Sequence, residues 1–185
     1  MSDSDGAELL RKISDGDEKA MADFYRLFEN RLYKFILSKL NDSFEASDIL
    51  NETFLDVWRK ADTFEGRSKV STWLFGIAYY KTMDRLRKKK PMLIDEENFP
   101  EIIDESDDAL VCLLSDERGD HVKHCLETLK EAHRAVMQLS FFEDMTYGEI
   151  AKIVDCPEGT VKTRMFHAKE AMKHCLQGRM QGDVA

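Results

Sequence analysis

Apolar side chains recur at helical spacing along this chain. Between residues 50 and 61, five of them stand at i, i+4, i+7, i+8 and i+11: Leu50, Phe54, Val57, Trp58 and Ala61. This spacing places them on one stripe of a helix and predicts that the stripe is buried core. No segment alternates apolar and polar residues for long enough to indicate a strand. The pattern therefore predicts an all-α fold.

The opposite face of this helix is polar around one apolar residue, Leu55. Its other members are Asp48, Asn51, Glu52, Asp56 and Arg59. The face can be a solvated surface or a docking surface with an apolar anchor. Periodicity alone favours the solvated surface.

Gly66 and the mixed polarity of residues 62–69 break the helix and predict a loop there, and a second helix follows. Ser71 is a suitable N-cap, and a buried stripe is predicted at Trp73, Leu74, Ile77 and Ala78. The helix should continue through a cluster of cations until Pro91: Arg85, Arg87, Lys88, Lys89 and Lys90. A helix dipole needs one or two such cations. The cluster, preceded by Tyr79 and Tyr80, therefore indicates a strip that contacts phosphates and stacks on bases.

Near the carboxyl end, residues 146–149 form a capping box, and Ile150, Ala151 and Val154 follow on the inner face of the helix that it opens. Asp155 and Cys156 predict a turn, and Pro157 suits the first position of a further helix. That helix has a core stripe at Val161, Met165, Ala168 and Met172. Two short helices joined by a tight turn predict a helix-turn-helix. The outward positions of the second helix, suited to phosphates and base edges, are Lys162, Thr163, Phe166, His167, Lys169 and Lys173. An ordinary solvated helix is the alternative.

Charge divides the chain further. The net charge is −9, yet residues 61–91 carry eight basic and three acidic side chains, and residues 92–120 carry one and eleven. The acidic segment contains Pro100 and lacks helical periodicity, so we predict a flexible linker there. The predicted parts are a helical domain at 1–91, the linker at 92–120, a helix-turn-helix domain at 121–178 and a tail at 179–185. A sharper hypothesis is that the linker keeps the basic faces from DNA in the free protein.

Several function classes are disfavoured by what the sequence lacks. It contains no long apolar segment and begins with acidic residues, which favours a cytoplasmic protein without a signal peptide. Catalytic and nucleotide-binding motifs are not apparent, so we expect neither an enzyme nor a cofactor. The four cysteines are predicted to be free thiols: Cys112, Cys125, Cys156 and Cys175. His121, His124 and Cys125 lie within one turn, but Cys125 shares an apolar stripe with Leu126 and Leu129, which favours packing over a metal or redox site.

Three of these segments resemble the extracytoplasmic-function (ECF) class of bacterial RNA polymerase sigma factors. Residues 48–58 resemble the region 2 signature, residues 64–87 the promoter-melting segment, and residues 145–173 region 4. The resemblance implies a non-enzymatic initiation factor that binds core RNA polymerase through its clamp helices and flap, and that recognises promoter DNA. It also implies control by an anti-sigma factor, often membrane-anchored. The rival hypothesis is a helix-turn-helix regulator that acts on duplex DNA without being a sigma subunit.

The resemblance also implies a role for individual residues. Polymerase binding falls to Asp48, Asn51, Glu52 and Leu55. Minus-10 DNA binding falls to Phe64, Arg67, Ser68, Lys69, Tyr79, Tyr80, Lys81, Asp84, Arg87 and Lys88. Minus-35 DNA binding falls to Lys162, Thr163, Arg164, Phe166, His167 and Lys169. The family commonly has Arg, Arg and Asn where this chain has Gly76, Tyr79 and Tyr80, so base stacking is expected to replace part of the hydrogen bonding.

Overall fold

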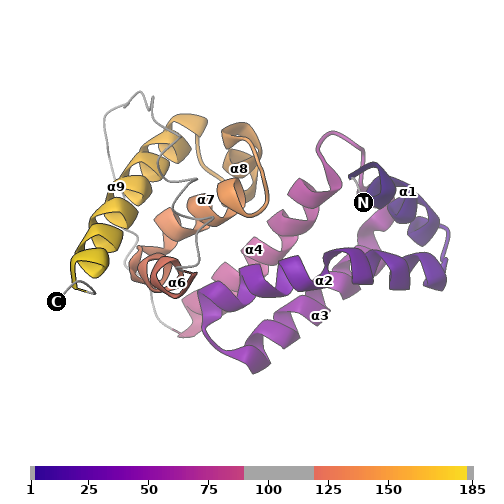
Figure 1. Ribbon diagram of the computed structural model, residues 1–185. Helices are drawn as coiled ribbons and strands as arrows, with labels where there is room; N and C mark the ends of the chain where they lie inside the picture. The colour runs from indigo at the N-terminus through magenta and orange to yellow at the C-terminus, as the bar shows by residue number, and fades with distance from the viewer. Residues whose placement is uncertain (1–2, 90–118, 183–185) are drawn as a thin grey trace. The chain divides into compact units, whose positions relative to one another are not determined.

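The computed structural model describes residues 3–89 and 119–182, and these ranges contain helices and no strand, so the predicted all-α fold is confirmed (Figure 1). The helices are α1 (Asp3–Ser14), α2 (Glu18–Leu40), α3 (Ser43–Lys60), the short 3-10 helix η1 (Ala61–Thr63), α4 (Val70–Lys89), α6 (Gly119–Thr128), α7 (Glu131–Phe141), α8 (Tyr147–Val154) and α9 (Glu158–Gly182). The chain divides into two compact units, the first containing α1 to α4 and the second containing α6, α7 and α9. Within the described residues no helix is both long and apolar enough to cross a bilayer.

Two expected boundaries fall inside helices. The predicted acidic linker at 92–120 lies outside the described residues except for Gly119 and Asp120, which begin α6. The hypothesis that the linker shields the basic faces concerns those undescribed residues. The expected tail begins within α9, which continues to Gly182. One glycine inside a helix costs only about 1 kcal/mol, so Gly178 does not end it.

Short polar turns set the order of helices in the first unit. The Asp17 carboxylate accepts hydrogen bonds from the backbone N–H groups of Lys19 and Ala20 and so caps α2. Asn41 ends α2 in the left-handed conformation, with φ of 52°. Asp42 then caps α3 in the same way as Asp17 caps α2. Each cap satisfies amide groups that the first turn of a helix leaves unpaired.

Aromatic side chains fill the core of this unit. Phe24 on α2 meets Phe54 on α3 edge to face at a centroid distance of 6.3 Å, and Phe35 meets Phe75 on α4 at 5.1 Å. Edge-to-face pairs of this kind add to the stabilisation from burial. They join α2 to both α3 and α4.

The predicted core stripe of α3 is confirmed at four positions and wrong at Trp58. Leu50, Phe54, Val57 and Ala61 are buried, whereas Trp58 is 38% exposed. Trp58 follows Leu50 by eight positions, so its side chain points about 80° away from that of Leu50 around the helix axis. This direction is at the edge of the buried arc. The core uses Thr53 as well, whose hydroxyl donates to the Ile49 carbonyl oxygen at 2.7 Å.

Helix α4 begins two residues earlier than predicted. Val70 is its first residue, so Ser71 is not an N-cap but lies buried in the first turn. Leu74 and Ala78 are buried as predicted, while Trp73 and Ile77 are only half-buried. The other buried side chains of this helix include Val70, Phe75, Thr82 and Met83. Helix α4 contacts α1, α2 and α3, so its buried arc is wider than one stripe.

The helix-turn-helix and its capping box are present in α8 and α9. The Thr146 hydroxyl accepts from the Glu149 N–H, and the Glu149 carboxylate accepts from the Thr146 N–H at 2.8 Å. Asp155 adopts the left-handed conformation at the turn, with φ of 50°. The Pro157 carbonyl oxygen accepts from Val161, so Pro157 lies just before the helix. All four predicted core residues of α9 are fully buried: Val161, Met165, Ala168 and Met172.

The prediction that all the cysteines are free thiols is wrong for two of them. Cys125 on α6 and Cys175 on α9 form a disulfide across a separation of 50 residues. Leu126 and Leu129 are buried beside Cys125, as their common stripe predicted. Spacing along the sequence cannot reveal this bond, because it depends on α6 packing against α9. Cys156 is a free thiol, and burial raises its pKa.

Candidate functional site

One face of α3 exposes three apolar side chains. Phe44, Leu55 and Trp58 are 85%, 52% and 38% exposed. Counting from Phe44, the residues Asp48, Asn51, Leu55 and Trp58 stand at i+4, i+7, i+11 and i+14, so all five share one face. Asp48 and Asn51 are exposed there too. We call these five residues the α3 stripe, and it holds three of the four residues predicted to bind a polymerase.

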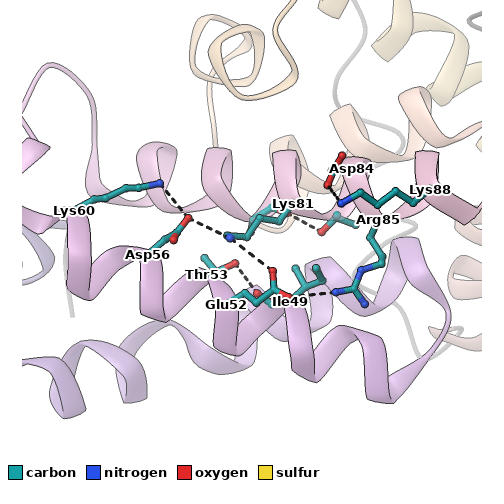
Figure 2. Close-up of polar contacts among 11 residues, drawn as sticks. Ile49, Glu52, Thr53, Asp56, Lys60, Lys81, Asp84, Arg85 and Lys88 are labelled. Carbon is teal, nitrogen blue, oxygen red and sulfur yellow. Dashed lines mark hydrogen bonds and ion pairs between the residues drawn. The ribbon is translucent and has the colours of Figure 1, made fainter.

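The fourth predicted residue, Glu52, is turned toward α4. Figure 2 shows Lys81 reaching between Asp56 and Glu52, at Nζ to carboxylate distances of 3.2 and 3.7 Å. Arg85 pairs with Glu52 at 3.2 Å. The other contacts of the set are Arg85 with Glu45 at 3.7 Å, Lys89 with Glu45 at 2.5 Å and Lys60 with Asp56 at 3.2 Å. We call these seven residues the α3–α4 ladder: Glu45, Glu52, Asp56, Lys60, Lys81, Arg85 and Lys89.

Burial and charge act in opposite directions on the Asp56 carboxylate. Burial raises its pKa because it disfavours the charged form, but the hydrogen bonds and charges of Lys81 and Lys60 outweigh that effect. The pKa of Asp56 is therefore lowered. Both partners of the Asp56–Lys81 pair are shielded, with side-chain exposures of 19% and 21%. Such a pair is less screened by salt than one in open solvent.

The α4 residues predicted to bind single-stranded DNA differ in accessibility. Tyr80 is 72% exposed, whereas Tyr79 is half-buried and its ring centroid lies 5.9 Å from the ammonium of the buried Lys39. Arg87 and Lys88 are exposed, and Lys88 pairs with Asp84 at 2.8 Å.

The loop before α4 presents the remaining predicted residues of this surface. The half-buried Phe64 ring contacts Trp73 at a centroid distance of 5.4 Å, which anchors the loop to α4. Arg67 is exposed and paired with Glu65. Ser68 is half-buried and Lys69 is exposed. The predicted surface is therefore a loop and a helix end around one strongly exposed aromatic ring.

On α9 the predicted residues split into outward and buried groups. Lys162 is exposed and pairs with Glu158 at 3.2 Å. Phe166 and His167 are half-buried neighbours, and the His167 ring stacks on His133 of α7 at 6.0 Å. The half-buried Arg164 turns toward Cys156, with 3.7 Å between guanidinium nitrogen and sulfur.

The expectation that Thr163 and Lys169 point outward is wrong. Thr163 is 4% exposed and its hydroxyl donates to the Gly159 carbonyl oxygen, while Lys169 is 9% exposed. Because α9 packs against both α6 and α7, its buried arc extends beyond the predicted stripe. Among the described residues, no group of three or more His, Cys, Asp and Glu side chains is placed to hold a metal ion.

Sequence reasoning placed Phe44, Glu45 and Lys60 on neither surface, and it placed Trp58 in the core. Phe44 could have been found from its helical spacing with Leu55. The acids Glu45 and Asp56 stand in phase with Glu52, and the ladder cations of α4 recur every fourth residue, so each stripe is visible in the sequence. Only the packing of α3 on α4 shows that the two stripes face each other.

Comparisons with known proteins identify both units. The pattern of Sigma-70 region 2 matches residues 24–91 and that of Sigma-70 region 4 matches residues 121–172. The ECF RNA polymerase sigma factor SigW of Bacillus subtilis is 31% identical over 180 residues, which cover 91% of this chain and 95% of SigW. The chain belongs to the ECF family of RNA polymerase sigma factors. A second relative of this sigma factor is SigK of Mycobacterium tuberculosis, 28% identical over 177 residues with 94% of each chain covered.

Solved structures share the fold of this sigma factor. CnrH in complex with the cytosolic domain of CnrY matches with a TM-score of 0.67 and 19% identity, covering 94% of this chain and 98% of CnrH. RpoE of Bartonella quintana in complex with the anti-sigma factor NepR matches with a TM-score of 0.62 and 24% identity, covering 84% and 97%. In this sigma factor, α3 and α4 lie in region 2, and α8 and most of α9 lie in region 4.

Proposed function

We propose that this sigma factor docks on core RNA polymerase through the α3 stripe and directs it to promoters with two separate DNA-binding surfaces. The observation that carries the proposal is the stripe itself. Its apolar side chains Phe44, Leu55 and Trp58 are exposed beside Asp48 and Asn51. An acidic and polar surface with apolar anchors fits a basic helical partner such as the polymerase clamp helices. A regulator that binds duplex DNA alone has no need of this surface.

The region 2 surface is proposed to hold the non-template strand of the minus-10 element. The exposed Tyr80 ring offers a stacking platform for an unpaired base, and Arg87 and Lys88 supply charge for phosphates. Stacking of this kind offsets part of the free energy needed to unstack a duplex. No covalent chemistry is required of the chain.

The region 4 surface is proposed to read the minus-35 element from the amino-terminal half of α9. Lys162 is exposed there, and Phe166 and His167 lie one turn further on. The buried Thr163 and Lys169 leave the proposed contact set. Arg164 remains a proposed backbone contact through its half-buried guanidinium.

Run-off transcription with purified core polymerase tests the whole proposal. We expect transcripts from promoter fragments only when the full chain is added. Leu55→Asp should lower the affinity for core polymerase by about tenfold or more, a usual loss for an interface anchor. The matched control is Ala7→Asp, which introduces the same charge at an exposed position of α1. Normal core binding by Leu55→Asp would contradict the docking assignment.

A second pair of variants tests the upstream contact. Lys162→Ala should weaken initiation from promoters that depend on the minus-35 element. The control Lys123→Ala, which removes an exposed cation of α6, should leave this initiation unchanged. The rival function, a helix-turn-helix regulator, predicts tight binding of duplex promoter DNA without polymerase. That result, together with no transcript from any fragment, would favour the rival.

Control by an anti-sigma factor completes the proposal. Such a partner would act by covering the α3 stripe, because an occupied stripe cannot bind polymerase. We therefore expect it to compete with core polymerase and to lose affinity for Leu55→Asp. A partner that inhibits transcription yet binds this variant normally would have to act at another surface.

A further inference from the structure

The α3–α4 ladder occupies cations that a nucleic acid would otherwise use. Lys81, Arg85 and Lys89 stand four residues apart, on one face of α4, and each lies within 4 Å of at least one α3 carboxylate. The sequence predicts phosphate contacts for Arg85 and Lys89, and a contact with the minus-10 strand for Lys81. The structure gives it two carboxylate partners inside the chain instead.

The carboxylates of the ladder resemble phosphates in charge. Glu45, Glu52 and Asp56 project from one face of α3 at i, i+7 and i+11, and so form a short row of anionic groups along the basic helix. Carboxylate and phosphate oxygens bind the same ammonium and guanidinium groups. The two kinds of anion therefore compete for the same cations.

The exposure of the ladder shows that this competition is possible. The side chains of Lys81, Arg85 and Lys89 are 21%, 28% and 47% exposed, so each cation is accessible while paired. Arg87 and Lys88 are exposed and lie outside the ladder. The cationic face of α4 is thus divided between cations that α3 holds and cations directed to solvent.

We propose that the α3 carboxylates of the ladder act as internal substitutes for DNA phosphates and mask Lys81, Arg85 and Lys89 from single-stranded DNA in the free chain. This inference rests on the proposed function of α4 in strand binding. The masked chain binds single-stranded DNA through fewer phosphate contacts than its sequence supplies. Removal of ladder acids restores those contacts.

The test measures binding of the full chain to a labelled single-stranded oligonucleotide between 50 and 200 mM salt. The double variant Glu52→Gln/Asp56→Asn removes both carboxylates that hold Lys81 and the nearer of the two that hold Arg85. Both acids lie outside the α3 stripe. Each recovered phosphate contact should steepen the plot of log affinity against log salt by about 0.7. Two contacts would add about 1.4 to the slope, so the gain in affinity on lowering the salt should be about sevenfold larger than for the unmodified chain.

The control is the double variant Glu8→Gln/Asp23→Asn. It changes the net charge equally and releases two cations from their acids, Lys12 and Arg26, on α1 and α2. We expect a smaller change in slope from this variant. Equal changes in both variants would reduce the effect to net charge and overturn the proposal, as would absence of binding by the ladder variant at 50 mM salt.

A further arm begins with the unmodified chain, and this first part does not depend on the folding of the acid variants. Lys81→Gln in the otherwise unmodified chain should leave the affinity and the salt slope unchanged, since Lys81 is masked. In the Glu52→Gln/Asp56→Asn background, where Lys81 has lost both carboxylate partners, the same substitution should lower the slope by about 0.7. A loss of that size in the unmodified chain would overturn the masking. Because this assay contains no polymerase, its outcome is separate from that of run-off transcription.

Discussion

Removing the Cys125–Cys175 disulfide should destabilise region 4 without affecting region 2. The bond joins residues 50 positions apart, and the chain-entropy treatment of such a loop gives about 4 kcal/mol of stabilisation, with 2–4 kcal/mol typical of measured cases. We therefore expect Cys125→Ala/Cys175→Ala to lower the urea midpoint of region 4 by roughly 2 M, at a slope of about 1–1.5 kcal/mol per molar for a unit of this size.

The two tryptophans provide an internal control for that experiment. Trp58 and Trp73 both lie in region 2, so their fluorescence follows the unfolding of that unit, while circular dichroism follows the helices of both units. The fluorescence midpoint should be the same in the variant and the unmodified chain. Reducing the unmodified chain with dithiothreitol should reproduce the variant. A dichroism transition that neither reduction nor substitution changes would refute the stabilising cross-link.

Three further substitutions test the assignments in region 2. Trp58→Ala should cost about 1–2 kcal/mol, less than the 3–5 kcal/mol typical of a buried aromatic, because the side chain is 38% exposed; a chain that fails to fold in circular dichroism would contradict this. Gly76→Ala should raise the melting temperature through a gain of up to about 1 kcal/mol, since no heavy atom lies within 4 Å of the added Cβ; a lower melting temperature would reveal a steric conflict. Asp56→Asn should destabilise the chain at neutral pH. Because the folded pKa of Asp56 is lowered, its stabilisation is present above the unfolded value of about 3.9 and is lost as the pH falls through the folded pKa. The difference in melting temperature should therefore shrink as the pH falls below the unfolded value and disappear once the pH is below the folded pKa of Asp56, and a constant difference would exclude the carboxylate as its source.

The features that the sequence predicted correctly depend on residues close together in the chain. The capping box of Thr146 and Glu149 and the left-handed turn at Asp155 involve neighbours within one helical turn. The core stripe of α9, including Val161 and Met165, follows from a single helical period. Local geometry decides such features, so they can be predicted from the order of residues along the chain. The family resemblance rested on the same short segments.

The features that only the tertiary structure decided depend on which helices meet. The Cys125–Cys175 bond requires α6 against α9, and the pairing of Lys81 with Asp56 requires α4 against α3. Helical periodicity gives the direction of a buried face but not its width. A helix with several neighbours buries a wider arc, which is why Thr163 is hidden on α9, while Trp58 at the edge of the α3 arc stays partly exposed. The sequence thus determined the helices, their caps and the family, and packing between helices decided which charged side chains remain available to a partner.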